Sequence, residues 1–130
     1  MVGFENVFDA TVTSIGEAQG TMICQLDGSA TQLEVPLGRA EPGTRVRIAI
    51  RAGDILLATE QPHGLSARNI FQGKILSMRR EGVTVIVMVE ARATFEVHLT
   101  PGTVDDLKLR ACADLGNDQD LLVQPSRAVP

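Results

Sequence analysis

Short apolar runs rich in β-branched residues alternate with polar positions along most of this chain. Between residues 45 and 50, three branched apolar side chains alternate with two arginines and an alanine. A period of two is typical of a strand with one buried face. Turn residues separate the runs, as in Asp27-Gly28-Ser29 and Pro42-Gly43. The first half is therefore predicted to hold strands at Phe8–Ile15, Met22–Leu26, Gln32–Leu37, Arg45–Ile50 and Ile55–Ala58.

The second half repeats this pattern of short strands. Only Thr103–Leu107 favours a helix, with Thr103 as its cap and two aspartates in its first turn. Near the end, Pro125 cannot donate to a sheet ladder, so the run Leu121–Ser126 is expected to be an edge strand. The remaining predicted strands are Ile70–Met78, Val83–Val89 and Thr94–Leu99.

The two halves also share sequence. Asn6-Val7-Phe8 recurs as Asn69-Ile70-Phe71, 63 positions later, and Leu33–Leu37 matches Phe95–Leu99. A tandem repeat implies two similar units, here residues 1–64 and 65–130. Such small units are marginal alone, so the copies should pack together or across a subunit interface. The predicted fold class is all-β, with tandem five-stranded barrels of the oligonucleotide/oligosaccharide-binding (OB) type and one short helix.

Composition narrows the function classes. The chain has 130 residues and a net charge of −4, which argues against a nucleic-acid partner. No segment is long enough to span a bilayer, and the first residues lack the features of a signal peptide. Cys24 and Cys112 are far apart, and reduced packing thiols in a cytoplasmic protein are favoured over a bridge. We therefore expect a cytoplasmic protein without direct membrane insertion.

The chemistry of an enzyme is missing from the sequence. There is no nucleophile elbow, no phosphate-cradling loop with its lysine, and no metal-ligand spacing. Glu34 and Glu96 occupy matching places and could form a carboxylate pair, but outward-facing charges explain them more simply, and His98 is interpreted as a solvated strand residue. We expect no catalytic residues, no metal and no cofactor.

Two stretches are rich in groups that bind oxyanions. Ser66, Arg68 and Asn69 bring a hydroxyl, a guanidinium and an amide to the start of the second copy. Arg51-Ala52-Gly53-Asp54 follows a strand of the first copy, where Gly53 could let backbone amides approach a ligand and Arg51 could supply charge. From spacing alone, a simple turn with an exposed arginine is the favoured interpretation.

A resemblance to a known family instead favours an oxyanion site in these two stretches. Ser66-Ala67-Arg68-Asn69-Ile70-Phe71-x-Gly73-x-Ile75 resembles the opening signature of the Mop (molybdenum-pterin binding) family. The tandem arrangement resembles the duplicated di-Mop unit, which is also classed among transport-associated OB (TOBE) domains. Residues 51–66 resemble the C-terminal region of the ModC family, the ATP-binding subunits of molybdate ABC transporters.

The resemblance implies a ligand and a site. Mop domains bind molybdate or tungstate at interfaces between Mop units. Carried over, one side of the site is Ser66, Ala67, Arg68 and Asn69, and the other side is Arg51, Ala52 and Gly53 in the first copy. In the second copy the nearest candidates for that other side are Gln124, Pro125 and Ser126. The chain departs from the family pattern at Glu5, which would repel a dianion, and at Gln124, which replaces a lysine.

Three functional hypotheses follow from the resemblance. The first is an oxyanion-binding regulatory domain of a molybdate importer's ATPase subunit. It would form homo-oligomers through its Mop units and, as part of a longer chain, would contact transporter ATPase and permease subunits at the inner face of the membrane. The second is a free-standing molybdate store, and the third is a structural dimerisation module with decayed anion sites. Tetrahedral dianions are alike, so the sequence does not separate molybdate from tungstate or sulfate.

Overall fold

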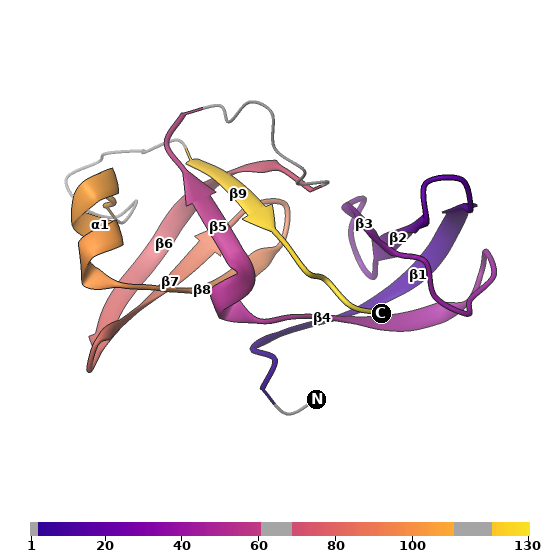
Figure 1. Cartoon of the computed structure of the whole chain (residues 1–130), viewed down its shortest axis with the longest axis horizontal. Helices are drawn as coiled ribbons and strands as arrows, with labels where there is room; N and C mark the ends of the chain where they lie inside the picture. The colour runs from indigo at the N-terminus through magenta and orange to yellow at the C-terminus, as the bar shows by residue number, and fades with distance from the viewer. Residues whose placement is uncertain (1–2, 61–68, 111–120) are drawn as a thin grey trace.

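The computed structural model of this chain describes residues 3–60, 69–110 and 121–130. These residues form strands, one short α-helix and one 3-10 turn, which confirms the all-β prediction (Figure 1). The predicted strands all occur, most of them with slightly different ends. The elements are β1 (Asn6–Gly16), β2 (Thr21–Leu26), β3 (Gln32–Pro36), β4 (Arg45–Ile50), η1 (Ala52–Asp54), β5 (Ile55–Ala58), β6 (Phe71–Glu81), β7 (Thr84–Glu90), β8 (Thr94–Leu99), α1 (Pro101–Leu107) and β9 (Leu121–Pro125).

The strands form two antiparallel sheets that lie side by side in Figure 1. The first sheet has the order β3-β2-β1-β4, and the second has the order β5-β9-β6-β7-β8. The repeat extends to the irregularities of pairing. β1 has a register shift between Val12 and Ser14, and β6 has one between Ile75 and Ser77, the positions that match them. A bulge bends its strand and increases the local twist, so both copies curve at the same place.

Backbone pairing crosses between the two copies near the end of each. β5 belongs to the first repeat in sequence but pairs with β9 of the second sheet, from Ile55 opposite Pro125 to Ala58 opposite Leu122. In return, the C-terminal Val129 bridges Ala49 of β4 through two backbone hydrogen bonds of 2.8 and 3.0 Å. The division into 1–64 and 65–130 therefore describes the sequence repeat, and the strand pairing crosses it.

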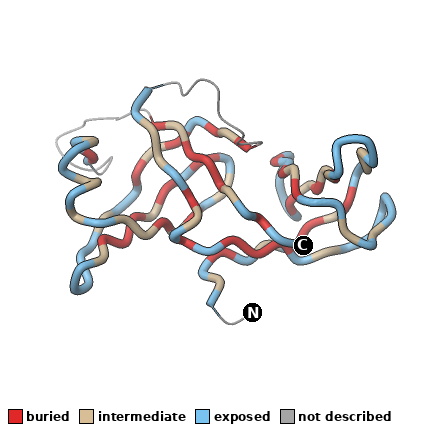
Figure 2. Tube along the Cα trace, viewed as in Figure 1, coloured by how far each residue is buried: buried red, intermediate tan, exposed pale blue. Residues whose placement is uncertain are grey.

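The core consists mainly of branched aliphatic side chains, as the lack of Trp and Tyr requires. Buried segments run through both sheets in Figure 2. Aromatic packing joins the copies, because Phe8 of β1 meets the fully buried Phe95 of β8 edge-on, with ring centroids 5.3 Å apart. The largest fully buried side chains are Phe95, Met22, Leu33, Ile48, Ile50, Ile55, Ile75 and Leu121.

The predicted start of the helix is wrong. α1 begins at Pro101, and its N-cap is Thr100, whose Oγ1 accepts a hydrogen bond from the Thr103 N–H at 3.3 Å. Proline suits the first helical position because its fixed φ is helical and its missing N–H would have no partner there. The earlier start leaves no acidic residue in the first turn of α1.

The prediction that the last strand lies at a sheet edge is also wrong. β9 lies between β5 and β6. Its ladder with β6 covers only residues 121–123, whereas its ladder with β5 continues to Pro125. Proline is tolerated because it stands at the end of the strand, beyond the ladder with β6.

Candidate oxyanion site

The predicted site residues fall into three groups. Ser66, Ala67 and Arg68 lie outside the described residues. Asn69 stands just before β6, beside β3 of the first copy. Arg51, Ala52 and Gly53 form the turn between β4 and β5, while Ser126 follows β9.

Asn69 uses its side chain to hold the two copies together. Its Oδ1 accepts a hydrogen bond from the Glu34 N–H at 2.8 Å, and its Nδ2 donates to the Glu34 carbonyl at 2.8 Å. The amide thus pairs with the edge of β3 as a strand residue would. Asn69 is only 8% exposed, so both bonds are largely shielded from water.

Asn6 makes the same pair of hydrogen bonds from the first copy to the second. Its Oδ1 accepts from the Glu96 N–H at 2.7 Å, and its Nδ2 donates to the Glu96 carbonyl at 2.8 Å. Asn6 matches Asn69 in the repeat, and Glu96 matches Glu34. We call these four residues the reciprocal asparagine lock. Sequence reasoning assigned Asn69 to the anion; the recurrence of both asparagines and both partner strands was the available signal for this other role.

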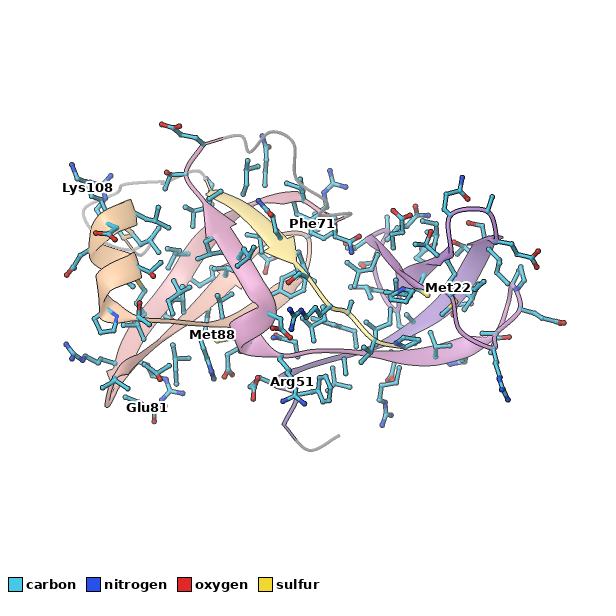
Figure 3. All side chains as sticks on the ribbon, in the orientation of Figure 1. Met22, Arg51, Phe71, Glu81, Met88 and Lys108 are labelled. Atoms are coloured by element: carbon cyan, nitrogen blue, oxygen red, sulfur yellow. The ribbon has the colours of Figure 1, made fainter. Side chains whose placement is uncertain are left out.

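The turn between β4 and β5 faces the N-terminal segment. The Arg51 guanidinium lies 4.6 Å from the centroid of the Phe4 ring, and its Nη1 donates to the Gly3 carbonyl at 3.4 Å. Figure 3 shows Arg51 where this turn approaches the N-terminal segment. Ala52 is fully buried, whereas a Cβ at Gly53 would meet no atom within 4 Å. Gly53 thus has open space beside it. We call residues 3–6 and 51–53 the first corner.

A carboxylate of the chain already occupies the first corner. Glu5 Oε1 accepts a hydrogen bond from the Ala52 N–H at 2.7 Å. Glu5 directly precedes Asn6, which is fixed to β8 by the reciprocal asparagine lock. The backbone amide of Ala52, a residue that the resemblance places in the site, therefore already has an anionic partner.

Strand register identifies the matching turn in the second copy. Phe8 pairs with Ile48 on β4, and the matching Phe71 pairs with Val123 on β9. Counting from these pairs makes Ser126, rather than Gln124, the counterpart of Arg51. The Ser126 N–H donates to the Asp54 carbonyl at 3.1 Å, and its hydroxyl also contacts that oxygen. Gln124 is buried, and its Oε1 has no hydrogen-bond partner among the described residues.

Three other titratable groups singled out in the sequence, Glu34, Glu96 and His98, have hydrogen-bond partners, whereas Cys112 lies outside the described residues. Glu96 Oε2 lies 2.6 Å from His98 Nε2, and Glu34 Oε1 accepts from the Thr21 hydroxyl at 2.8 Å. His98 is therefore half-buried and paired rather than fully solvated. Burial raises the pKa of the Cys24 thiol, which keeps it protonated and unreactive, as expected of a packing residue.

Metal and membrane features are missing from the part of the chain that the structure describes. No three His, Cys, Asp or Glu side chains gather there as a metal site would require. Within the same residues, no helix has the length and apolar character needed to cross a membrane.

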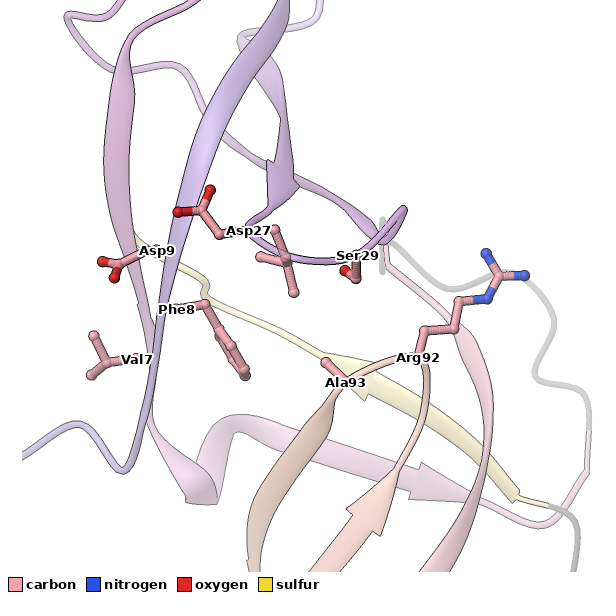
Figure 4. A pocket seen from close by; sticks show the side chains of 8 residues that line it. Val7, Phe8, Asp9, Asp27, Ser29, Arg92 and Ala93 are labelled. Atoms are coloured by element: carbon pink, nitrogen blue, oxygen red, sulfur yellow. The ribbon is translucent and has the colours of Figure 1, made fainter.

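A cavity of about 390 Å³ opens between β1 and the turn that joins β7 to β8 (Figure 4). Two carboxylates line it, Asp9 and Asp27, together with Ser29 and Arg92. The carboxylates pair with arginines of β4 and would oppose an oxyanion entering from solvent. The cavity is therefore a poor candidate for the anion site.

Sequence comparison identifies relatives among molybdenum importers. Over 106 residues the chain is 37% identical to the molybdenum import ATP-binding protein ModC of Mesorhizobium japonicum. Over 83 residues it is 36% identical to ModC of Rhodopseudomonas palustris strain HaA2. This chain is homologous to a region of the ModC proteins. The matches take in 80% and 64% of this chain but only 28% and 22% of the relatives. No protein-family model matches the chain.

Structural comparison identifies the same fold in a known molybdate-binding protein. The cytoplasmic molybdate-binding protein ModG, solved with molybdate bound, superposes with a TM-score of 0.80 at 20% sequence identity. The superposition covers 98% of this chain and 96% of that one. The match to ModG confirms the predicted Mop-type, OB-like fold and shows that it extends over both copies.

Proposed function

We propose that this chain is a molybdate- or tungstate-binding regulatory region of a molybdate importer's ATP-binding subunit. The carrying observation is its homology over most of its length to part of the ModC proteins, which are named as ATP-binding proteins of molybdenum import. The fold shared with ModG, a protein described as binding molybdate, supports the same ligand. The chain itself would bind the anion without catalysing a reaction.

The proposed site lies where the second copy begins. Ser66 and the Ala67 amide act as neutral donors, and Ser126 belongs to the other side. Arg68 either supplies charge directly or braces the loop by pairing with a nearby carboxylate. A tetrahedral dianion is expensive to desolvate, so several donors must converge on it. Two features support a site at a shared boundary. Asn69 ties the start of the second copy to β3 of the first, and β5 of the first copy pairs with β9 of the second.

The proposed mechanism is thermodynamic linkage. An anion bound between units stabilises the arrangement of units that binds it best. In an ATPase subunit, this coupling would hold the transporter inactive when molybdate is plentiful. The region would then act in the cytoplasm, at the inner face of the membrane, with the remaining ATPase and the permease as partners.

A free-standing molybdate-binding protein is the second candidate. The observation that favours it is the shared fold, because both copies of the chain superpose on ModG, a protein described as a cytoplasmic molybdate-binding protein. Molybdate binding by the isolated chain fits both candidates, and reconstitution with a transporter separates them. A structural module with decayed sites is the third, and it predicts no binding at all.

Removal of Arg68 should weaken molybdate binding. Charge-assisted hydrogen bonds contribute about 1.5–3 kcal/mol, so Arg68→Ala should raise the molybdate dissociation constant roughly 10- to 100-fold. Ser66→Ala removes a neutral donor and should cost roughly 3- to 10-fold. Isothermal titration calorimetry measures both. Arg39→Ala removes the same charge from an exposed position and serves as the control; equal affinities in all these proteins would refute the proposed site.

Binding should also depend on assembly. If the anion lies between units of different chains, molybdate should shift the population towards the larger species, as measured by light scattering at dilutions that dissociate it. The affinity should fall as the protein is diluted into monomers. Full-affinity binding to a stable monomer would show that one chain suffices.

A further inference from the structure

Glu5 is held in place on both sides. Its carboxylate accepts the Ala52 N–H at 2.7 Å. The next residue, Asn6, is 5% exposed and is fixed to Glu96 by two hydrogen bonds. Glu5 is therefore a positioned side chain, even though it lies on the surface.

Its contact is the one that a free oxyanion would make. A carboxylate oxygen and an oxygen of a tetrahedral dianion are both anionic acceptors, and each would take the same amide proton. Arg51 stands beside it, with its guanidinium over Phe4 and its Nη1 near the Gly3 carbonyl. A dianion entering the first corner would have to displace Glu5 and would meet its negative charge at close range.

The second copy carries the opposite charge at the matching position. Glu5 precedes Asn6 as Arg68 precedes Asn69, so a carboxylate in one copy replaces a guanidinium in the other. The repeat thus keeps the asparagine lock in both copies but inverts the charge next to it. This inversion distinguishes two positions that the sequence repeat makes equivalent.

We infer that Glu5 is an internal ligand of the first corner, which closes it to free tetrahedral oxyanions and so limits how many the chain binds. The inference rests on the proposed function, because it concerns which of two related corners takes the anion. The Glu5 carboxylate takes the hydrogen bond of the Ala52 N–H, which a free oxyanion would otherwise accept. The proposed function assigns the anion to the copy that carries Arg68.

The test replaces Glu5 and looks for a gained site. Glu5→Ala and Glu5→Ser are titrated with molybdate by calorimetry, and the Ala52 amide is followed by ¹⁵N–¹H NMR. Glu5 lies outside β1 and is exposed, so the fold should persist, and either variant can serve. Glu17→Ala removes an exposed carboxylate from the turn between β1 and β2 and controls for net charge. The double variant Glu5→Ala/Arg51→Ala tests whether the gained site uses Arg51.

We expect the Glu5 variants to bind an additional molybdate per chain, with a saturable shift of the Ala52 amide that the parent and Glu17→Ala lack. The double variant should lose that addition. No gain in either Glu5 variant, or the same gain in Glu17→Ala, would overturn the inference. A parent that binds no molybdate would instead count against the proposed function, and a gain in the Glu5 variants would still support the role of Glu5.

Discussion

Replacing either asparagine of the reciprocal lock with alanine should lower the free energy of unfolding by about 2–4 kcal/mol. Each side chain makes two hydrogen bonds to the backbone of the other copy, between 2.7 and 2.8 Å long. Alanine removes both and leaves an N–H and a carbonyl of a β-strand without partners. Groups orphaned in this way lose their hydrogen bonds and keep their desolvation penalty.

The direction of the two bonds gives a sharper test. Asn69→Asp keeps an acceptor for the Glu34 N–H but places a second acceptor against the Glu34 carbonyl. It should therefore destabilise at least as much as Asn69→Ala. Gln72→Ala removes an exposed amide side chain from nearby β6 and should change stability by less than about 0.5 kcal/mol. Urea denaturation measures the free energy of unfolding of each variant. If Asn69→Ala lowers it as little as Gln72→Ala does, the asparagine lock does not contribute to stability.

The strands could be predicted because alternation reports burial. Residues 45–50, 55–58 and 94–99 were expected as strands with the ends that the structure has. The bulges of β1 and β6 were not predicted, although they fall at matching positions of the repeat. Alternation says which face is buried but does not name the neighbouring strand. For that reason, the sequence did not predict that β5 pairs with β9 or that Val129 bridges Ala49 of β4.

The candidate site could be predicted only in part, because an asparagine side chain can bind an oxyanion or pair with the edge of a strand. The amide of Asn69 suits an oxyanion and suits a strand edge equally well, and only its place beside Glu34 shows the second use. Glu5 was expected to repel a dianion, but its bond to the Ala52 N–H depends on a turn 47 positions away. The counterpart of Arg51 was placed at Gln124 because a linear alignment ignores the register that points to Ser126.

The glycine of the Mop signature should be the least replaceable residue of β6. A Cβ at Gly73 would lie 2.7 Å from the Glu90 carbonyl oxygen, 2.8 Å from the Ala91 Cβ and 3.0 Å from a Val123 methyl group. The first two contacts involve backbone or a Cβ, which cannot rotate away, so β7 would have to move from β6. Overpacking of this kind costs about 1–3 kcal/mol, and we expect Gly73→Ala to lie at or above the upper end.

The measurement is the thermal or urea unfolding of three variants. Gly102→Ala serves as the matched control, because a Cβ there meets no atom within 4 Å and alanine favours a helix by about 0.5–1 kcal/mol. It should therefore stabilise the protein slightly. Gly73→Ala/Ala91→Gly removes one of the three close contacts and should recover part of the loss. If Gly73→Ala is as stable as the parent protein, β6 and β7 can move apart at little cost. Steric crowding would then not explain why glycine stands at position 73.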